Sequence, residues 1–120
     1  KTIIMDCYDL MRAVCLVEAF PGNKAFAVDE YLKRTVRFDV SEEGYLSNPV
    51  IFAEYGETNV LVSKTGDVYI PDGQIYVYDP NGKLKGEIII PERPSCVIFG
   101  DSEEKTLIVT ARSSLYRVSL

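Results

Sequence analysis

The chain has 120 residues, enough for one ordinary domain, and its 47% apolar and 26% charged residues are typical of a folded globular protein. Its net charge of −5 argues against a nucleic-acid partner, because phosphate binding needs a basic face. The sequence has no histidine, which excludes serine–histidine and cysteine–histidine nucleophile pairs and histidine-ligated metals. Any catalysis would have to come from carboxylates, tyrosine, lysine, a metal bound through oxygen, or residues outside this chain.

Three cysteines, Cys7, Cys15 and Cys96, are scattered along the sequence. No pair has the spacing of a metal knuckle or a redox motif, so we expect buried, reduced thiols and a cytoplasmic location. No apolar run is long enough to span a bilayer, so no membrane partner is expected. The first residue is Lys1 rather than methionine, and we expect a processed, trimmed or partial piece of a longer protein.

Alternation of apolar and polar residues predicts strands along most of the chain. Residues 10–19 also fit a short helix, but the turn Pro21-Gly22 ends this segment and we favour a strand. Turn residues separate the strands at short intervals, in segments 21–23, 42–44, 65–67, 72–73, 79–82 and 101–104. Short strands with a turn about every ten residues predict an all-β protein.

Three strands of one kind begin at residues 36, 75 and 115, which are 39 and 40 residues apart. A period near 40 with about four strands per unit is typical of β-propeller blades. We therefore predict three four-stranded blades, with a sandwich of twelve strands as the alternative. Three blades do not close a ring, and proteins avoid exposed blade faces and strand edges. We expect a second copy of the chain, or a missing N-terminal half, to complete the ring.

Two segments carry a resemblance to a known family. Residues 73–100, GQIYVYDPNGKLKGEIIIPERPSCVIFG, and residues 105–116, KTLIVTARSSLY, resemble the C-terminal part of the gluconolactonase / senescence-marker-protein / luciferin-regenerating-enzyme family. Residues 45–54 and the pair Val28-Asp29 also fit this pattern. The resemblance implies the C-terminal half of a six-bladed propeller. It also implies a metal-dependent lactone hydrolase with Ca²⁺ or a similar divalent ion in the central channel, and a sugar lactone as substrate.

The resemblance also sets the expected boundaries of the blades. The chain is then a single half-propeller unit, residues 1–120, with blades at about 13–55, 56–91 and 95–120. Residues 13–18, 60–64 and 96–100 would be innermost strands, and residues 50–54 and 85–90 outermost strands. The last blade would lack its outer strand, whereas residues 2–7 would be an outer strand that completes another blade.

The positions at which the family places metal ligands differ in this sequence. The family has an asparagine and an aspartate directly before two innermost strands, whereas the matching residues here are Arg12 and Thr58. A further glutamate of the family would lie outside this chain. A shift of a residue or two would bring Glu57 or Asn59 into the site as oxygen ligands for the ion. Otherwise the metal site is lost, because a guanidinium repels a cation.

Two classes of function therefore remain open. The chain could belong to a metal-dependent lactone hydrolase, or to a degenerate relative that is a non-catalytic scaffold or ligand-binding module. In the second case Arg12 could bind an anion such as a sugar acid, because a guanidinium forms paired hydrogen bonds with carboxylates.

Overall fold

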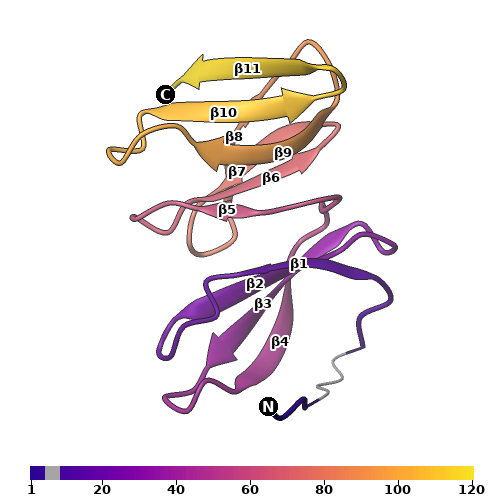
Figure 1. Ribbon diagram of the computed structural model, residues 1–120, viewed down its shortest axis with the longest axis vertical. Helices are drawn as coiled ribbons and strands as arrows, with labels where there is room; N and C mark the ends of the chain where they lie inside the picture. Colours follow the sequence, from indigo (N-terminus) through magenta and orange to yellow (C-terminus); the bar gives the residue numbers. More distant parts are fainter. Residues whose placement is uncertain (5–8) are drawn as a thin grey trace.

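The computed structural model describes residues 1–4 and 9–120. In this part of the chain every regular element is a β-strand, and the strands form three antiparallel sheets that follow one another along the sequence (Figure 1). The predicted fold class, an all-β protein built of propeller blades, is confirmed. None of the described residues belongs to a helix that could cross a membrane.

The first sheet contains four strands in sequence order, β1 (Ala13–Val17), β2 (Lys24–Asp29), β3 (Arg34–Val40) and β4 (Leu46–Ala53). Segment 10–19 therefore contains a strand and not a helix, as favoured from its sequence. In β3 the side chains of Val36, Phe38 and Val40 are buried, whereas Arg37 and Asp39 between them are partly exposed. This period of two is the pattern from which the strand was predicted.

The second sheet contains β5 (Leu61–Val62), β6 (Val68–Asp72), β7 (Gln74–Tyr78) and β8 (Leu84–Ile88), and the third contains β9 (Pro94–Phe99), β10 (Thr106–Ala111) and β11 (Ser114–Ser119). The third sheet has three strands, so β11 forms its edge. Residues 1–4 form no strand, and Met5, Asp6 and Cys7 of the expected outer strand 2–7 lie outside the described residues.

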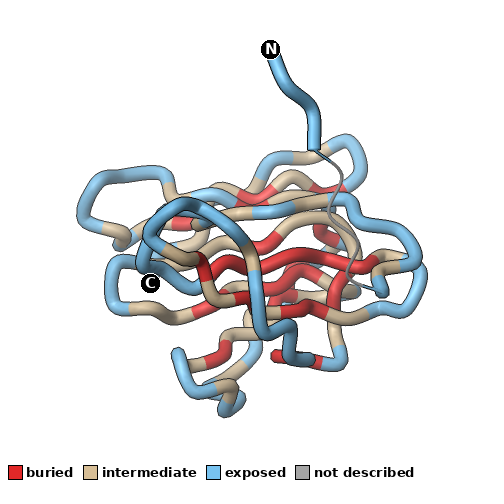
Figure 2. The backbone as a smooth tube through the Cα atoms, turned by 90° about the horizontal axis from the view of Figure 1, so that it is seen from below, coloured by how far each residue is buried: buried red, intermediate tan, exposed pale blue. Residues whose placement is uncertain are grey.

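Apolar side chains between neighbouring sheets form the core. The faces between the first and second sheets bury Phe26, Val28, Val68 and Ile70, among others, and Phe26 and Phe52 meet edge to face with ring centroids 5.0 Å apart. The faces between the second and third sheets bury a second cluster made of Ile75, Ile90, Val97, Leu107, Val109 and Ala111. Figure 2 shows that the buried residues follow the strands, whereas the turns at both ends of the strands are exposed.

A third apolar cluster lies on the face of the first sheet that points away from the second. It contains Ala25, Ala27, Val36, Phe38 and Val40, with Leu10 and Leu46 packed against it. The stack of sheets therefore has two outward faces, one on the first sheet and one on the third. The connections that lead into β1, β5 and β9 begin at one end of the strands, and they carry the residues singled out from the sequence.

Candidate functional site

The loop before β1 is held in place by a buried carboxylate. Asp29 is fully buried at the end of β2 and accepts hydrogen bonds from the backbone N–H groups of Met11 (3.0 Å), Arg12 (3.1 Å) and Leu32 (3.3 Å). Burial alone raises the pKa of Asp29, but these hydrogen bonds and the charge of Arg34 outweigh it and leave the pKa below its ordinary value. The backbone of Arg12 is therefore fixed by an ionised side chain.

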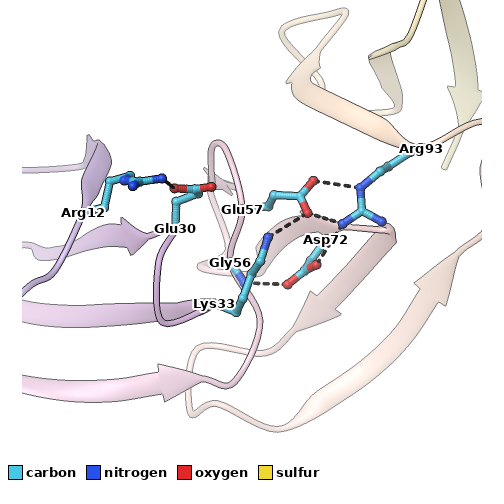
Figure 3. Close-up of polar contacts among 7 residues, drawn as sticks. All are labelled: Arg12, Glu30, Lys33, Gly56, Glu57, Asp72 and Arg93. Atoms are coloured by element: carbon cyan, nitrogen blue, oxygen red, sulfur yellow. Dashed lines mark hydrogen bonds and ion pairs between the residues drawn. The ribbon is translucent and has the colours of Figure 1, made fainter.

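The side chain of Arg12 lies on the protein surface, at the end of the first sheet where β1 begins. Its Nη1 donates a hydrogen bond to Glu30 Oε2 at 2.8 Å (Figure 3). Its guanidinium also lies 6.0 Å from the centroid of the Tyr31 ring. The side chain remains 61% exposed. Arg12 thus presents a cation beside an acid and an aromatic ring, and it offers no oxygen ligand to a metal.

Glu57 lies in the connection between β4 and β5 and is engaged by two cations. Lys33 Nζ donates to Oε2 at 3.1 Å, Arg93 Nε donates to Oε1 at 3.1 Å, and Arg93 Nη2 also pairs with Oε2 (Figure 3). Arg93 Nη2 lies a further 3.6 Å from Asp72 Oδ1. The hydrogen bond from Arg93 is the main cause of the lowered pKa of Glu57, and the same contact raises the pKa of Arg93. Glu57 is therefore ionised and already neutralised.

Asp72 links this cluster to the backbone. Its Oδ2 accepts a hydrogen bond from the N–H of Gly56 at 3.0 Å. A Cβ on Gly56 would lie 2.6 Å from the carbonyl oxygen of Arg34, so the connection passes too close to β3 for any other residue. Glycine at this position lets the chain bring Glu57 to the two cations.

Thr58 and Asn59 follow directly after Glu57 and do not take part in this cluster of charges. Thr58 Oγ1 is buried and has no hydrogen-bond partner within the described part of the chain. Both ends of the Asn59 amide are used by one residue of β9, because Nδ2 donates to the carbonyl of Val97 at 2.9 Å and Oδ1 accepts from its N–H at 3.2 Å. Asn59 therefore ties the second sheet to the third, and its side-chain oxygen is already engaged by Val97.

The residues predicted from the sequence fall into two groups. Arg12 pairs with Glu30, whereas Glu57 pairs with Lys33 and Arg93. Lys33, Asp72 and Arg93 were not predicted from the sequence, because charged residues in turns are common and no local pattern shows which of them meet. Their positions along the sequence could have identified them, because all three residues lie at the same end of the predicted strands as Glu57.

These residues do not fit the divalent ion that the resemblance implies. A hard cation needs several oxygen ligands that converge on one point. Among residues 1–4 and 9–120 there is no group of three or more acidic or thiol side chains that could hold a metal. Arg12 and Thr58, which the resemblance matches to the family's ligand positions, supply no carboxylate, and the shifted candidates Glu57 and Asn59 are engaged by other partners.

Both the sequence and the fold of this chain resemble those of known proteins. The family model described as SMP-30/Gluconolactonase/LRE-like region matches residues 21–113. A search of curated proteins finds no match. Among solved structures, a gluconolactonase from Xanthomonas campestris superposes with a TM-score of 0.80 at 22% identity, over 94% of this chain and 39% of its own.

Two further structures share the fold at lower identity. A luciferin-regenerating enzyme gives a TM-score of 0.74 at 16% identity, over 93% of this chain and 46% of its own. A calcium-binding protein, regucalcin from Agrobacterium tumefaciens, gives 0.67 at 17%, over 85% of this chain and 38% of its own. The chain thus spans less than half the length of these proteins. Because the family model covers most of its residues, the chain belongs to the SMP-30/gluconolactonase/LRE-like family.

Proposed function

We propose that this chain is part of a gluconolactonase-like propeller that works as a ligand-binding module without a divalent ion, and not as a metal-dependent lactone hydrolase. The observation that carries the proposal is the pairing of Glu57 with Lys33 and Arg93. Glu57 is the acidic residue closest in sequence to an expected ligand position, and two cations occupy its carboxylate. An arriving cation would have to displace both.

The ion pairs of Glu57 also hold the three sheets together, which is a role that a bound metal ion could otherwise have. Lys33 comes from the loop between β2 and β3 of the first sheet, Glu57 from the connection to the second sheet, and Arg93 from the connection to the third. The carboxylate of Glu57 therefore joins all three sheets at one end. A module held together in this way needs no metal for its folding.

The ligand we propose is an anionic sugar, such as a sugar acid. The names of the structural relatives point to the lactone of a sugar acid as the related compound. Arg12 donates one hydrogen bond to Glu30 and its side chain is 61% exposed, so its other N–H groups can pair with a carboxylate of the ligand. Tyr31, which is 60% exposed beside it, offers a flat ring for the apolar face of a sugar. A cytoplasmic location, favoured by the thiols of Cys15 and Cys96, belongs to the same proposal.

Two assays on the protein in its assembled state test these statements. The first measures hydrolysis of gluconolactone with and without added Ca²⁺, Mn²⁺ or Zn²⁺, and with a chelator. We expect hydrolysis at the uncatalysed rate in every condition. Metal-stimulated hydrolysis that a chelator abolishes would show that a working metal site exists and that the proposal is wrong.

The second assay measures the thermal shift caused by gluconate. We expect Arg12→Ala to abolish the shift and Arg112→Ala, at another exposed arginine in the turn between β10 and β11, to leave it unchanged. An unchanged shift in Arg12→Ala, or no shift in the unsubstituted protein, would exclude Arg12 as the anion-binding residue.

A further inference from the structure

We propose that Tyr55 and Tyr76 form an oxidative cross-linking site, at which the loss of one electron from each ring joins the two side chains as a dityrosine. Tyr55 lies in the connection between β4 and β5, and Tyr76 lies in β7 of the second sheet. The cross-link ties this connection to the second sheet by a covalent bond. The proposal does not depend on a metal site or on a ligand of Arg12.

The arrangement of the two rings differs from that of the other aromatic pairs in the described part of the chain. The ring planes of Tyr55 and Tyr76 are 12° from parallel and their centroids are 3.7 Å apart. The three other pairs that the structure describes meet edge to face, with centroids 5.0 to 5.7 Å apart. Two free rings prefer offset or edge-to-face contacts to full overlap. The overlap of Tyr55 and Tyr76 is therefore imposed by the positions of their main chains.

Both main chains are held by hydrogen bonds. The carbonyl of Tyr55 accepts a hydrogen bond from Thr35 Oγ1 at 2.8 Å. The N–H of the next residue, Gly56, donates to Asp72 Oδ2 at 3.0 Å. Tyr76 is paired in register with residues of both neighbouring strands, β6 and β8. The rings therefore stay side by side in the folded protein, which gives two reacting groups a high effective concentration.

The pair can also be reached by an oxidant. Both side chains pack against the core cluster between the first and second sheets, and both remain partly exposed. A small oxidant at the protein surface can therefore take an electron from each ring. The exposed part of each ring leaves room for the rings to tilt as a bond forms between them.

A hydrogen bond joins the side chains of the two tyrosines. It is the main cause that raises the pKa of Tyr76 to about 12. Because the rings are parallel and their hydroxyl groups meet, both rings point in the same direction. The ring carbons next to the hydroxyl-bearing carbons, the Cε atoms, then face each other across the stack. In a tyrosyl radical the unpaired electron resides largely on these carbons and on the phenolic oxygen.

The reaction balances with two equivalents of a one-electron oxidant, such as tris(bipyridyl)ruthenium(III). Each phenol loses one electron to the oxidant and its hydroxyl proton to water, and two phenoxyl radicals result. The two unpaired electrons then form a bond between one Cε atom of each ring. The hydrogen on each of these carbons moves to the phenolic oxygen of the same ring and restores the aromatic system. Overall the pair loses two electrons and two protons, and two ruthenium(III) ions become ruthenium(II).

The cross-link has a consequence for the fold. It closes a loop from residue 55 to residue 76, which contains β5 and β6. Covalent closure of a loop lowers the conformational entropy of the unfolded chain, so the cross-linked protein should unfold at a higher urea concentration. The bond also holds the connection directly before Gly56 and Glu57.

The test is oxidation of the assembled protein by photogenerated tris(bipyridyl)ruthenium(III), in buffer without a thiol reductant. We expect dityrosine fluorescence, a loss of two hydrogen atoms from the mass of the chain, and a cross-linked peptide that contains residues 55 and 76. Tyr55→Phe and Tyr76→Phe each keep two aromatic rings but remove one phenol, so each should lower dityrosine formation within the chain about tenfold or more. Tyr45→Phe, at a tyrosine that is 61% exposed, is the matched control and should leave it unchanged.

A second measurement shows whether the folded geometry is responsible. In concentrated urea the two rings separate, and the yield of the peptide that joins residues 55 and 76 should fall about tenfold or more. Absence of this peptide in the folded protein, dityrosine only between different chains, or an equal yield in urea would each overturn the proposal. An unchanged yield in Tyr55→Phe would do the same. Circular dichroism of every variant shows that it has folded.

Discussion

At the scale of single residues, the end of the strands at which β1, β5 and β9 begin is organised by pairs of opposite charge. Glu57 is the central residue, because its side chain is only 15% exposed and both of its oxygens have cationic partners. Asp29 has a similar role for the loop before β1, where it holds three backbone N–H groups. Both carboxylates are therefore ionised for structural reasons, and neither is free to act on a ligand.

The lowered pKa of Glu57 gives a pH dependence with a defined sign. A carboxyl whose pKa is lower in the folded than in the unfolded state stabilises the fold above its ordinary value of 4.5 and loses that contribution as the pH falls. Glu57→Gln should therefore cost about 1–2 kcal/mol of unfolding free energy at pH 7. Urea unfolding should show that the difference from the unsubstituted protein shrinks below pH 4.5. Glu103→Gln, at an exposed pair with Lys105, is the control and should change little at either pH.

How far the candidate site could be predicted differs between its residues. The sequence placed Arg12 and Thr58 in the connections before inner strands, and they precede β1 and β5 in the structure. It did not show that Glu57 meets Arg93, 36 residues further along the chain. Partners of an ion pair are set by how the sheets stack, and hydrophobic periodicity carries no information about charges in the connections.

At the scale of elements, the side chain of Asn59 joins the second sheet to the third by hydrogen bonds of the kind that backbone groups make between strands. The amide of Asn59 exchanges two hydrogen bonds with Val97, as a residue of a neighbouring strand would. The first strand of the second sheet, β5, contains residues 61–62, whereas the family resemblance implied an innermost strand at residues 60–64. The alternation of apolar residues and the turns of the second sheet could be predicted from the sequence. The hydrogen bonds of the Asn59 side chain to the third sheet could not.

Loss of the two hydrogen bonds between Asn59 and Val97 should destabilise β9. Asn59→Ala leaves the N–H and carbonyl of Val97 without their partner, at a cost of about 1–3 kcal/mol in unfolding free energy. Hydrogen exchange should show faster exchange of the Val97 amide than of amides in the first sheet. Asn81→Ala is the matched control, because among the described residues Asn81 is engaged through its backbone N–H, and its exchange pattern should remain that of the unsubstituted chain. Equal exchange at Val97 in both variants would contradict the role assigned to Asn59.

The connection between the first and second sheets depends on a glycine. In Gly56→Ala the new Cβ would lie 2.6 Å from the carbonyl oxygen of Arg34, so the connection must move and Glu57 with it. We expect a loss of about 1–3 kcal/mol, measured by denaturant unfolding. Gly86→Ala in β8 is the control, since its Cβ would have nothing within 4 Å. A stability loss as small in Gly56→Ala as in Gly86→Ala would mean that the close approach is not needed.

At the scale of the whole molecule, the fold was predictable because it repeats. A period near 40 residues and strand periodicity of two indicated blades before any coordinates, and three sheets in sequence order are what the structure contains. The ion pairs that join the sheets were not predictable in this way. Local sequence rules do not show which charged side chains of different repeats meet, as Glu57 and Arg93 do.

At the same scale, the chain shares the fold of its family but does not have a set of oxygen ligands for a metal among its described residues. The chain belongs to a family whose relatives include a gluconolactonase and a calcium-binding protein. Its own residues at this end form ion pairs between sheets in place of a set of oxygen ligands. The central claim is therefore that the assembled protein is stable and binds its ligand without a divalent ion.

Thermal unfolding with and without divalent ions tests this claim most directly. The protein is stripped with a chelator and then heated alone or with millimolar Ca²⁺, Mn²⁺ or Zn²⁺. An ion bound at 100 times its Kd would add about 2.7 kcal/mol of stability, a rise of several degrees in Tm. Our account predicts the same Tm in all conditions. A rise in Tm with one of these ions that the chelator reverses and that Glu57→Gln abolishes would contradict it.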